Sequence, residues 1–138
     1  MRITYIFLFL LTMPLYALER SAGSQEAELY FISPLNGDIV SKNVRVNFGL
    51  KAFGIAPAGV DFNQTGHHHL IVDTELPPLG QPIPSDMNHI HFGKGQTEVA
   101  LDLASGNHTL QLLLGDYRHI PHNPPIFSNK IRIHVIPK

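Results

Sequence analysis

The chain has 138 residues, of which 15% are charged, and a formal net charge of −1 with neutral histidines. No stripe of Lys and Arg is present, so nucleic acid is not expected as a partner, because phosphates are bound by clustered positive charge. Cysteine is absent, which excludes disulfides and thiolate metal sites. A metal site in this chain would have to use His, Met and carboxylate ligands.

The first 17 residues have the pattern of a secretory signal peptide. Arg2 gives a positive start, residues 3–13 are apolar apart from two threonines, and Ala17 offers a small residue for cleavage. The apolar run is shorter than the ~20 residues that a membrane-spanning helix needs. We therefore expect cleavage after Ala17, a periplasmic or secreted protein, and no stable membrane span after cleavage. An uncleaved N-terminal anchor is the alternative.

The mature chain is expected to begin with a loose segment and two strands. Residues 18–27 are polar and without a pattern, which is typical of a free terminus. Residues 28–33 are aromatic and β-branched and predict the first strand. Asn36 and Gly37 predict a tight turn, since this pair supplies positive φ angles. Residues 43–50 alternate between apolar residues and polar residues or glycine, which predicts an antiparallel strand with one wet face.

A histidine-rich strand follows at residues 67–73. Its alternation places His68 on the same face as the apolar residues Leu70 and Val72, so a structural role in the core is expected for His68. The imidazoles of His67 and His69 then face the opposite side.

Three long loops are expected, at residues 52–66, 77–84 and 115–127. The last two are rich in proline, which disfavours a helix and a central strand. Loops of this length are uncommon unless they have a function.

Further strands are predicted at residues 88–92, 97–103, 108–114 and 129–136. No stretch has the periodicity of a helix. Seven or eight short strands separated by turns favour an all-β, immunoglobulin-like antiparallel β-sandwich, with a small jelly roll or barrel as the alternative. We expect a single histidine-rich domain over residues 28–138.

Seven of the nine histidines fall into three groups: His67, His68 and His69; His89 and His91; and His119 and His122. Two histidines that are two positions apart on a strand place both imidazoles on one face, an arrangement that suits a metal ion. Met87 continues this period ahead of His89. The two remaining histidines, His108 and His134, are expected to be surface or filler residues.

We predict a transition-metal site from these groups. The candidate ligands are six imidazoles and one thioether: His67, His69, His89, His91, His119, His122 and Met87. Imidazole suits Zn, Cu, Fe and Ni, and an adjacent thioether favours Cu(I), so copper is expected ahead of zinc. Six histidines exceed the four ligands of one ion, so some are expected to be structural or to serve a second site. Asp116 is a candidate to orient an imidazole.

The predicted function is metal carriage or buffering, with the metal ion as partner. One alternative is a structural or adhesion-type sandwich whose histidines tie the proline-rich loops together. A second alternative is a metal-dependent, cupin-like enzyme, because Glu98 follows His89 and His91 in a His-X-His…Glu pattern. An enzyme is less favoured, since the chain has neither a Gly-X-Ser-X-Gly motif nor a glycine loop for phosphate.

Several segments resemble a bacterial family called domain of unknown function 4399. They are residues 66–73, 76–78, 89–98, 106–112 and 115–122, and the resemblance extends over residues 29–135. It implies an exported bacterial domain with a histidine-rich signature and no assigned activity. His108 matches a motif position of the family, so the resemblance implies that His108 buttresses the site.

Overall fold

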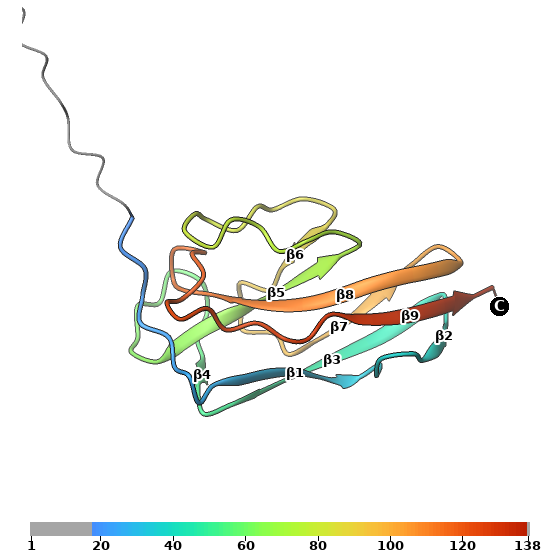
Figure 1. The fold of residues 1–138 in the computed structure, drawn as a ribbon, viewed down its shortest axis with the longest axis horizontal. Coiled ribbons are helices and arrows are strands. Elements are labelled where there is room, and N and C mark those ends of the chain that lie inside the picture. The colour runs from blue at the N-terminus through green and yellow to red at the C-terminus, as the bar shows by residue number, and fades with distance from the viewer. Residues whose placement is uncertain (1–17, 138) are drawn as a thin grey trace, which may run out of the picture.

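The structure is a computed structural model that describes residues 18–137 (Figure 1). The predicted signal peptide, residues 1–17, lies outside the described residues. Residues 18–137 contain no helix that is long and apolar enough to cross a membrane.

The described residues form nine strands in two sheets. The strands are β1 (Glu28–Ser33), β2 (Ile39–Ser41), β3 (Asn43–Lys51), β4 (Gly54–Ile55), β5 (Thr65–Val72), β6 (His89–His91), β7 (Glu98–Asp102), β8 (Gly106–Gly115) and β9 (Ile131–Ile136). One sheet has the order β1-β3-β7, and the other has the order β2-β9-β8-β5-β4, with β6 also paired to β5. The predicted all-β sandwich is confirmed.

The prediction of seven or eight antiparallel strands is wrong in number and in part of the pairing. β2 pairs with β9, and β4 pairs with β5, and both pairs are parallel. These two strands have three and two residues, which is too short for an alternation to appear in the sequence. β4 lies inside the stretch that was predicted to be a continuous loop.

The main core lies between the two sheets. It is built from alternate residues of β3, β5, β8 and β9, among them Val46, Leu70, Leu112 and Val135, all fully buried. Each such side chain contributes about 1.5–3 kcal/mol to folding on burial. The alternation predicted for these strands therefore identifies their inward faces correctly.

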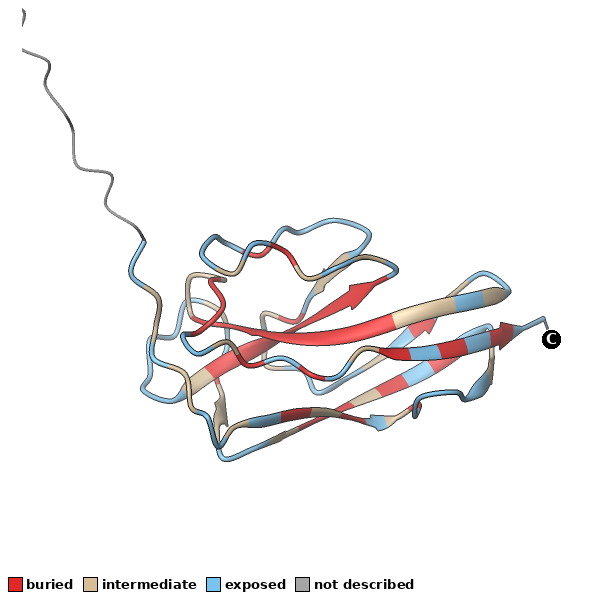
Figure 2. Ribbon diagram, viewed as in Figure 1, coloured by how far each residue is buried: buried red, intermediate tan, exposed pale blue. Residues whose placement is uncertain are grey.

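β5 and the second half of β8 are buried on both faces (Figure 2). Ile71 and Leu113 point away from the main core and pack against Ile83 in a second, smaller cluster. Ile83 belongs to the proline-rich loop that follows β5, and its N–H donates to the carbonyl of His119 at 2.8 Å. This loop therefore covers the outer face of the six-stranded sheet, beside the positions where β5 carries His67 and His69.

The N-terminal segment was predicted to be loose, but it forms hydrogen bonds with a distant part of the chain. Gly23 N–H donates to Asn123 O, and Asn123 N–H donates to Ser21 O, each at 2.9 Å. The segment thus runs along the loop that follows β8, a partner far away in the sequence that local composition does not reveal.

Candidate metal centre

β5 supplies two imidazoles to the outer face of the sheet. Side chains alternate along a strand, so His67 and His69 point outward while His68 points into the core. The ring of His68 lies 5.1 Å from that of Phe48, and its Nδ1–H donates to Gln96 O at 3.2 Å. His68 is therefore a core residue, as its alternation with Leu70 predicts.

Two other segments bring further imidazoles to the same place. His91 of β6 is directly paired with His69 of β5, so their side chains share a face. His119 comes from residues 116–122, which we call the His119 loop. His119 has a φ of 67°, and its N–H donates to Asp116 O at 2.8 Å. This left-handed conformation turns the imidazole back toward the sheet.

We call His67, His69, His91 and His119 the four-histidine cluster. Ligand nitrogens of His67, His91 and His119 lie within 4.8 Å of one another. The Nε2 atoms of His91 and His119 are 3.2 Å apart. The ring of His69 lies 4.8 Å from that of His67 and 5.1 Å from that of His91. The cluster is formed by three segments that are distant in the sequence.

The cluster has a buried side and an open side. His67 and His69 are fully buried, His119 is half-buried, and His91 is exposed. Both ring nitrogens of His67 and the Nδ1 of His69 are buried without a hydrogen-bond partner. A buried polar atom without a partner costs about 1–3 kcal/mol. The cluster therefore combines two fully buried imidazoles of the sheet with one imidazole at the surface.

Burial keeps these imidazoles neutral. Desolvation, followed by the neighbouring imidazoles, lowers the pKa of His67 from 6.5 to about 4 and that of His69 to about 2. Burial and the nearby His119 also lower the pKa of His91. Metal ions bind neutral imidazole, so His67, His69 and His91 are in the state that coordination requires at neutral pH.

Two glycines make room for the rings. A Cβ on Gly115 would lie 2.8 Å from the Cε1 of His69. A Cβ on Gly93 would overlap the ring of His91. Neither Gly93 nor Gly115 is among the residues that the sequence predicted for the site. Their position next to histidine motifs was the available signal, but only the strand pairing shows which ring each glycine accommodates.

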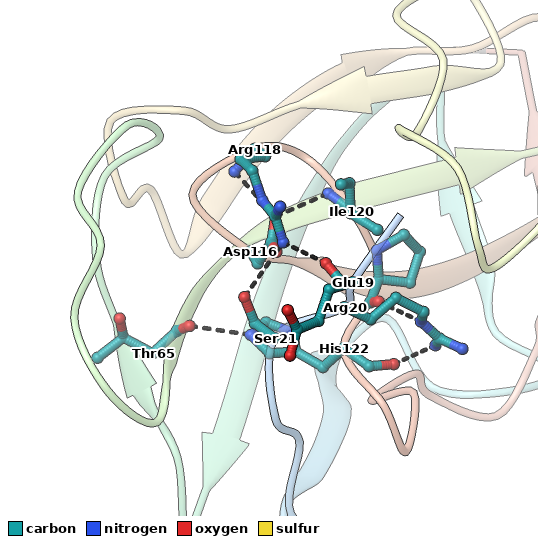
Figure 3. A network of polar contacts seen from close by, with 9 residues as sticks. Glu19, Arg20, Ser21, Thr65, Asp116, Arg118, Ile120 and His122 are labelled. Carbon is teal, nitrogen blue, oxygen red and sulfur yellow. Dashed lines mark hydrogen bonds and ion pairs between the residues drawn. The ribbon is translucent and has the colours of Figure 1, made fainter. Parts of the chain in front are cut away.

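Asp116 organises the loop rather than an imidazole. It is 1% exposed, and its Oδ1 accepts the N–H groups of Arg118 and Ile120 at 2.8 and 3.0 Å. Its Oδ2 accepts the hydroxyl of Ser21 at 2.7 Å and a guanidinium N–H of Arg118 at 3.2 Å (Figure 3). Burial alone would raise the pKa of Asp116, but these hydrogen bonds hold it below its ordinary value. None of its hydrogen bonds within the described residues reaches an imidazole, so the predicted orienting role is wrong in its detail.

Comparison with known proteins identifies the family. The family described as Domain of unknown function (DUF4399) matches residues 46–136, which is more than half of the chain. The chain belongs to this family. No curated protein matches the chain. Among solved structures, it is similar to the fibronectin(III)-like modules of Clostridium thermocellum CbhA, with 10% identity and a TM-score of 0.43. That match covers 81% of this chain and 46% of the other, so the chain spans less than half the length of the structure it matches.

Two predicted ligands of this DUF4399 chain lie outside the cluster. The Nε2–H of His122 donates to Thr65 O at 3.0 Å, and its ring packs edge-on against Phe53. The Nδ1–H of His89 donates to Asp86 Oδ1 at 2.8 Å. Each of these rings has an oxygen acceptor, which is the arrangement of a histidine that ties segments together.

Three other predicted residues are also distant from the cluster. Met87 is 91% exposed and is not part of the cluster. His108 lies near the opposite end of β8, where it bonds to Asp73 and to Ala104 O, and it therefore does not buttress the site as the family resemblance implied. His134 bonds to Asn107. His108 and His134 thus have polar ties of their own and are more than filler.

The acid of the cupin-like alternative is on the other sheet. Glu98 begins β7, which pairs only with β3 among the described strands, and its carboxylate forms an exposed ion pair with Arg45 at 3.1 Å. The short spacing from the histidines suggested proximity, but the turn at Gly95 carries the chain across to the second sheet. Glu98 therefore cannot act together with the four-histidine cluster.

Proposed function

We propose that the four-histidine cluster binds a transition-metal ion, and that the protein is an exported carrier or buffer of that metal. The observation that carries the proposal is the environment of His67. Both of its ring nitrogens are buried without a hydrogen-bond partner, and three other imidazoles surround it. A histidine network that served structure alone would satisfy these nitrogens with oxygen acceptors, as those of His68 and His122 do in part.

His67, His91 and His119 are the proposed ligands, with His69 as a fourth. Nitrogens bound at 2.0–2.1 Å to a tetrahedral ion are roughly 3.3–3.4 Å apart, close to the 3.2 Å between His91 and His119. The other separations, up to 4.8 Å, require ring movements of about 1 Å on binding. The exposed position of His91 supports entry and release of the ion, which carriage requires.

Copper is proposed ahead of zinc, on a ground different from the one the sequence suggested. Because Met87 is exposed and lies outside the cluster, its thioether no longer supports a preference for Cu(I). A site of imidazoles alone binds Cu(II) more tightly than Zn(II), because divalent affinities follow the Irving–Williams order. Export is proposed from the signal-like pattern of residues 1–17.

A structural sandwich is the second candidate. Five histidines outside the cluster tie segments together by hydrogen bonds to oxygen: His68, His89, His108, His122 and His134. These ties support a structural role for those five rings, and they leave the four-histidine cluster unexplained.

The test is a metal titration of untagged protein without residues 1–17. Cu(I), Cu(II) and Zn(II) are added to apo protein in competition with chelators. We expect one ion per chain and sub-micromolar affinity, lost in the His67→Ala/His91→Ala variant. The matched control, His89→Ala/His134→Ala, also removes two histidines and keeps the affinity. Equal affinity of the two variants would refute the metal site and favour the structural alternative.

A further inference from the structure

The His119 loop is held partly by hydrogen bonds to its own Asp116, and its end is poor in backbone donors. It contains Pro121 and is followed by Pro124, neither of which has a backbone N–H to donate. His119 itself is held at a φ of 67°, which costs a non-glycine residue on the order of 1 kcal/mol or more. Such a conformation persists only where its surroundings fix it.

Asp116 and the N–H of Ile83, which donates to His119 O, supply part of those surroundings. The N-terminal segment, residues 19–23, supplies further contacts to both ends of the loop (Figure 3). The Nε–H of Arg20 donates to Pro121 O at 2.8 Å, and a second N–H of the same guanidinium donates to His122 O. Ser21 donates its hydroxyl to the carboxylate of Asp116. The contacts reach the loop at its beginning, through Asp116, and at its end, through Pro121 and His122.

The contacts are also reciprocal. Arg118 of the loop donates to the carbonyl of Glu19 at 2.6 Å. Ser21 O and Gly23 N–H both pair with Asn123, just beyond the loop, at 2.9 Å. A single carboxylate, that of Asp116, thus accepts both from the N-terminal segment and from the loop N–H groups of Arg118 and Ile120. The segment lies outside residues 46–136, which match the family.

We propose that Arg20 and Ser21 are positioning residues of the metal centre, because the N-terminal segment holds the His119 loop in the conformation that presents His119 to the ion. This inference rests on the proposed function. Without the segment, the loop samples conformations in which His119 is turned away, and the apparent affinity falls by the fraction of chains that are competent to bind. By linkage, a bound ion must hold the segment in place as strongly as the segment assists binding.

The first experiment uses this reciprocity. Hydrogen exchange of the Gly23 amide is measured with and without Zn(II), in protein that lacks only residues 1–17. Zn(II) is expected to slow this exchange by at least about 10-fold, since opening of the segment would then release His119 from the ion. The amide of Leu103 is the control, because it bonds to Lys42 O at the far end of the other sheet. Because Leu103 is far from the N-terminal segment, Zn(II) should not slow its exchange by holding that segment in place.

The second experiment removes the two side chains. The Arg20→Ala/Ser21→Ala variant is expected to bind Zn(II) about 10-fold more weakly. The Arg20→Ala/Ser21→Thr variant, which keeps a hydroxyl at position 21, is expected to recover part of the lost affinity. Loss of a positive charge near the site would by itself strengthen cation binding, so a fall has the opposite sign to a simple charge effect. Glu19→Gln is the control within the segment, because Glu19 contacts Arg118 through its backbone carbonyl, which the substitution keeps.

The outcomes separate the two proposals. Slower Gly23 exchange together with weaker binding by the double variant would support the inference. Tight Zn(II) binding with unchanged Gly23 exchange, or with unchanged affinity of the double variant, would overturn it and leave the metal site standing. No Zn(II) or copper binding by the unmodified sequence would overturn both.

Discussion

The Nε2 atoms of His91 and His119 lie 3.2 Å apart, although 28 positions separate the two residues in the chain. His91 comes from β6 and His119 from the loop after β8, so the contact joins two segments on opposite sides of β5. In the metal-free protein one of the two rings must donate its N–H to the other. An ion between them would need both Nε2 lone pairs, so the proton on the donor ring would move to the Nδ1 of that same ring, and both imidazoles would bind in the neutral form.

Met87 and His89 provide a direct test of which ligands are real. Both continue the period of His91 in the sequence, but Met87 is exposed and His89 bonds to Asp86. We expect Met87→Leu and His89→Ala to bind copper and zinc within about 2-fold of the unmodified protein. His91→Ala, on the same strand, should lose at least about 100-fold, since even loss of a residue that supports a ligand costs 10–100-fold. A competition titration measures all three. If Met87→Leu lost metal affinity, the prediction that the Met87 thioether is a ligand would be correct after all.

Gly93 tests whether the position of one ring controls affinity. A methyl group at Gly93 would overlap the imidazole of His91, which must then move. We expect Gly93→Ala to weaken metal binding by about 10-fold or more, because misplaced ligands lose coordination energy. Gly80→Ala is the matched control, since a Cβ there meets no atom within 4 Å. Equal affinity of the two variants would show that His91 can bind the ion from another position.

The sequence predicted the strands better than the site. The alternation of β3, β5, β8 and β9 reports burial directly, so the core residues and the inward position of His68 follow from it. Grouping of histidines correctly indicated that several would meet. It could not separate His91, which shares a face and a strand pair with His69, from His89, which lies two residues away and bonds to Asp86.

The remaining differences come from contacts between distant segments. β2 and β4 exist only because β9 and β5 offer them a parallel edge. The N-terminal segment is ordered by Asp116 and Asn123, roughly a hundred residues away. Neither type of contact leaves a periodic pattern in the short segment itself, so reading local sequence leaves both undetected.

His68 and His67 are neighbours with opposite expected roles. His68 is buried against Phe48 in the core, so His68→Ala should lower the free energy of unfolding by about 2–4 kcal/mol through loss of packing. Metal affinity of the folded protein should stay within about 3-fold. His67→Ala should lose metal affinity and cost less stability, because it also removes two buried nitrogens without partners. Urea unfolding and a metal titration of both variants measure this. If both variants lost only stability, the cluster would be structural.

Stability of the apo protein is expected to fall as the pH is lowered. Burial lowers the pKa of His67 and His68 to about 4 and that of His69 to about 2, against 6.5 for an unfolded histidine. Below about pH 6.5 the unfolded chain takes up protons that the folded chain does not. The free energy of unfolding should therefore decrease from pH 7 to pH 4, by up to about 1.4 kcal/mol per pH unit for each histidine. His108 acts in the opposite direction. Burial alone would lower its pKa, but the hydrogen bonds to Asp73 and Ala104 O raise it.

Urea unfolding at pH 7.5, 6.0 and 5.0 measures this slope. His69→Gln should flatten it, because a side chain that cannot titrate replaces a histidine whose pKa is lowered by burial. Saturating Zn(II) should raise the free energy of unfolding at each pH, since the ion stabilises only the folded chain. A free energy of unfolding that stays constant from pH 7.5 to 5.0 would mean that the buried imidazoles gain protons while the chain is folded. The cluster would then open to solvent more readily than its burial indicates.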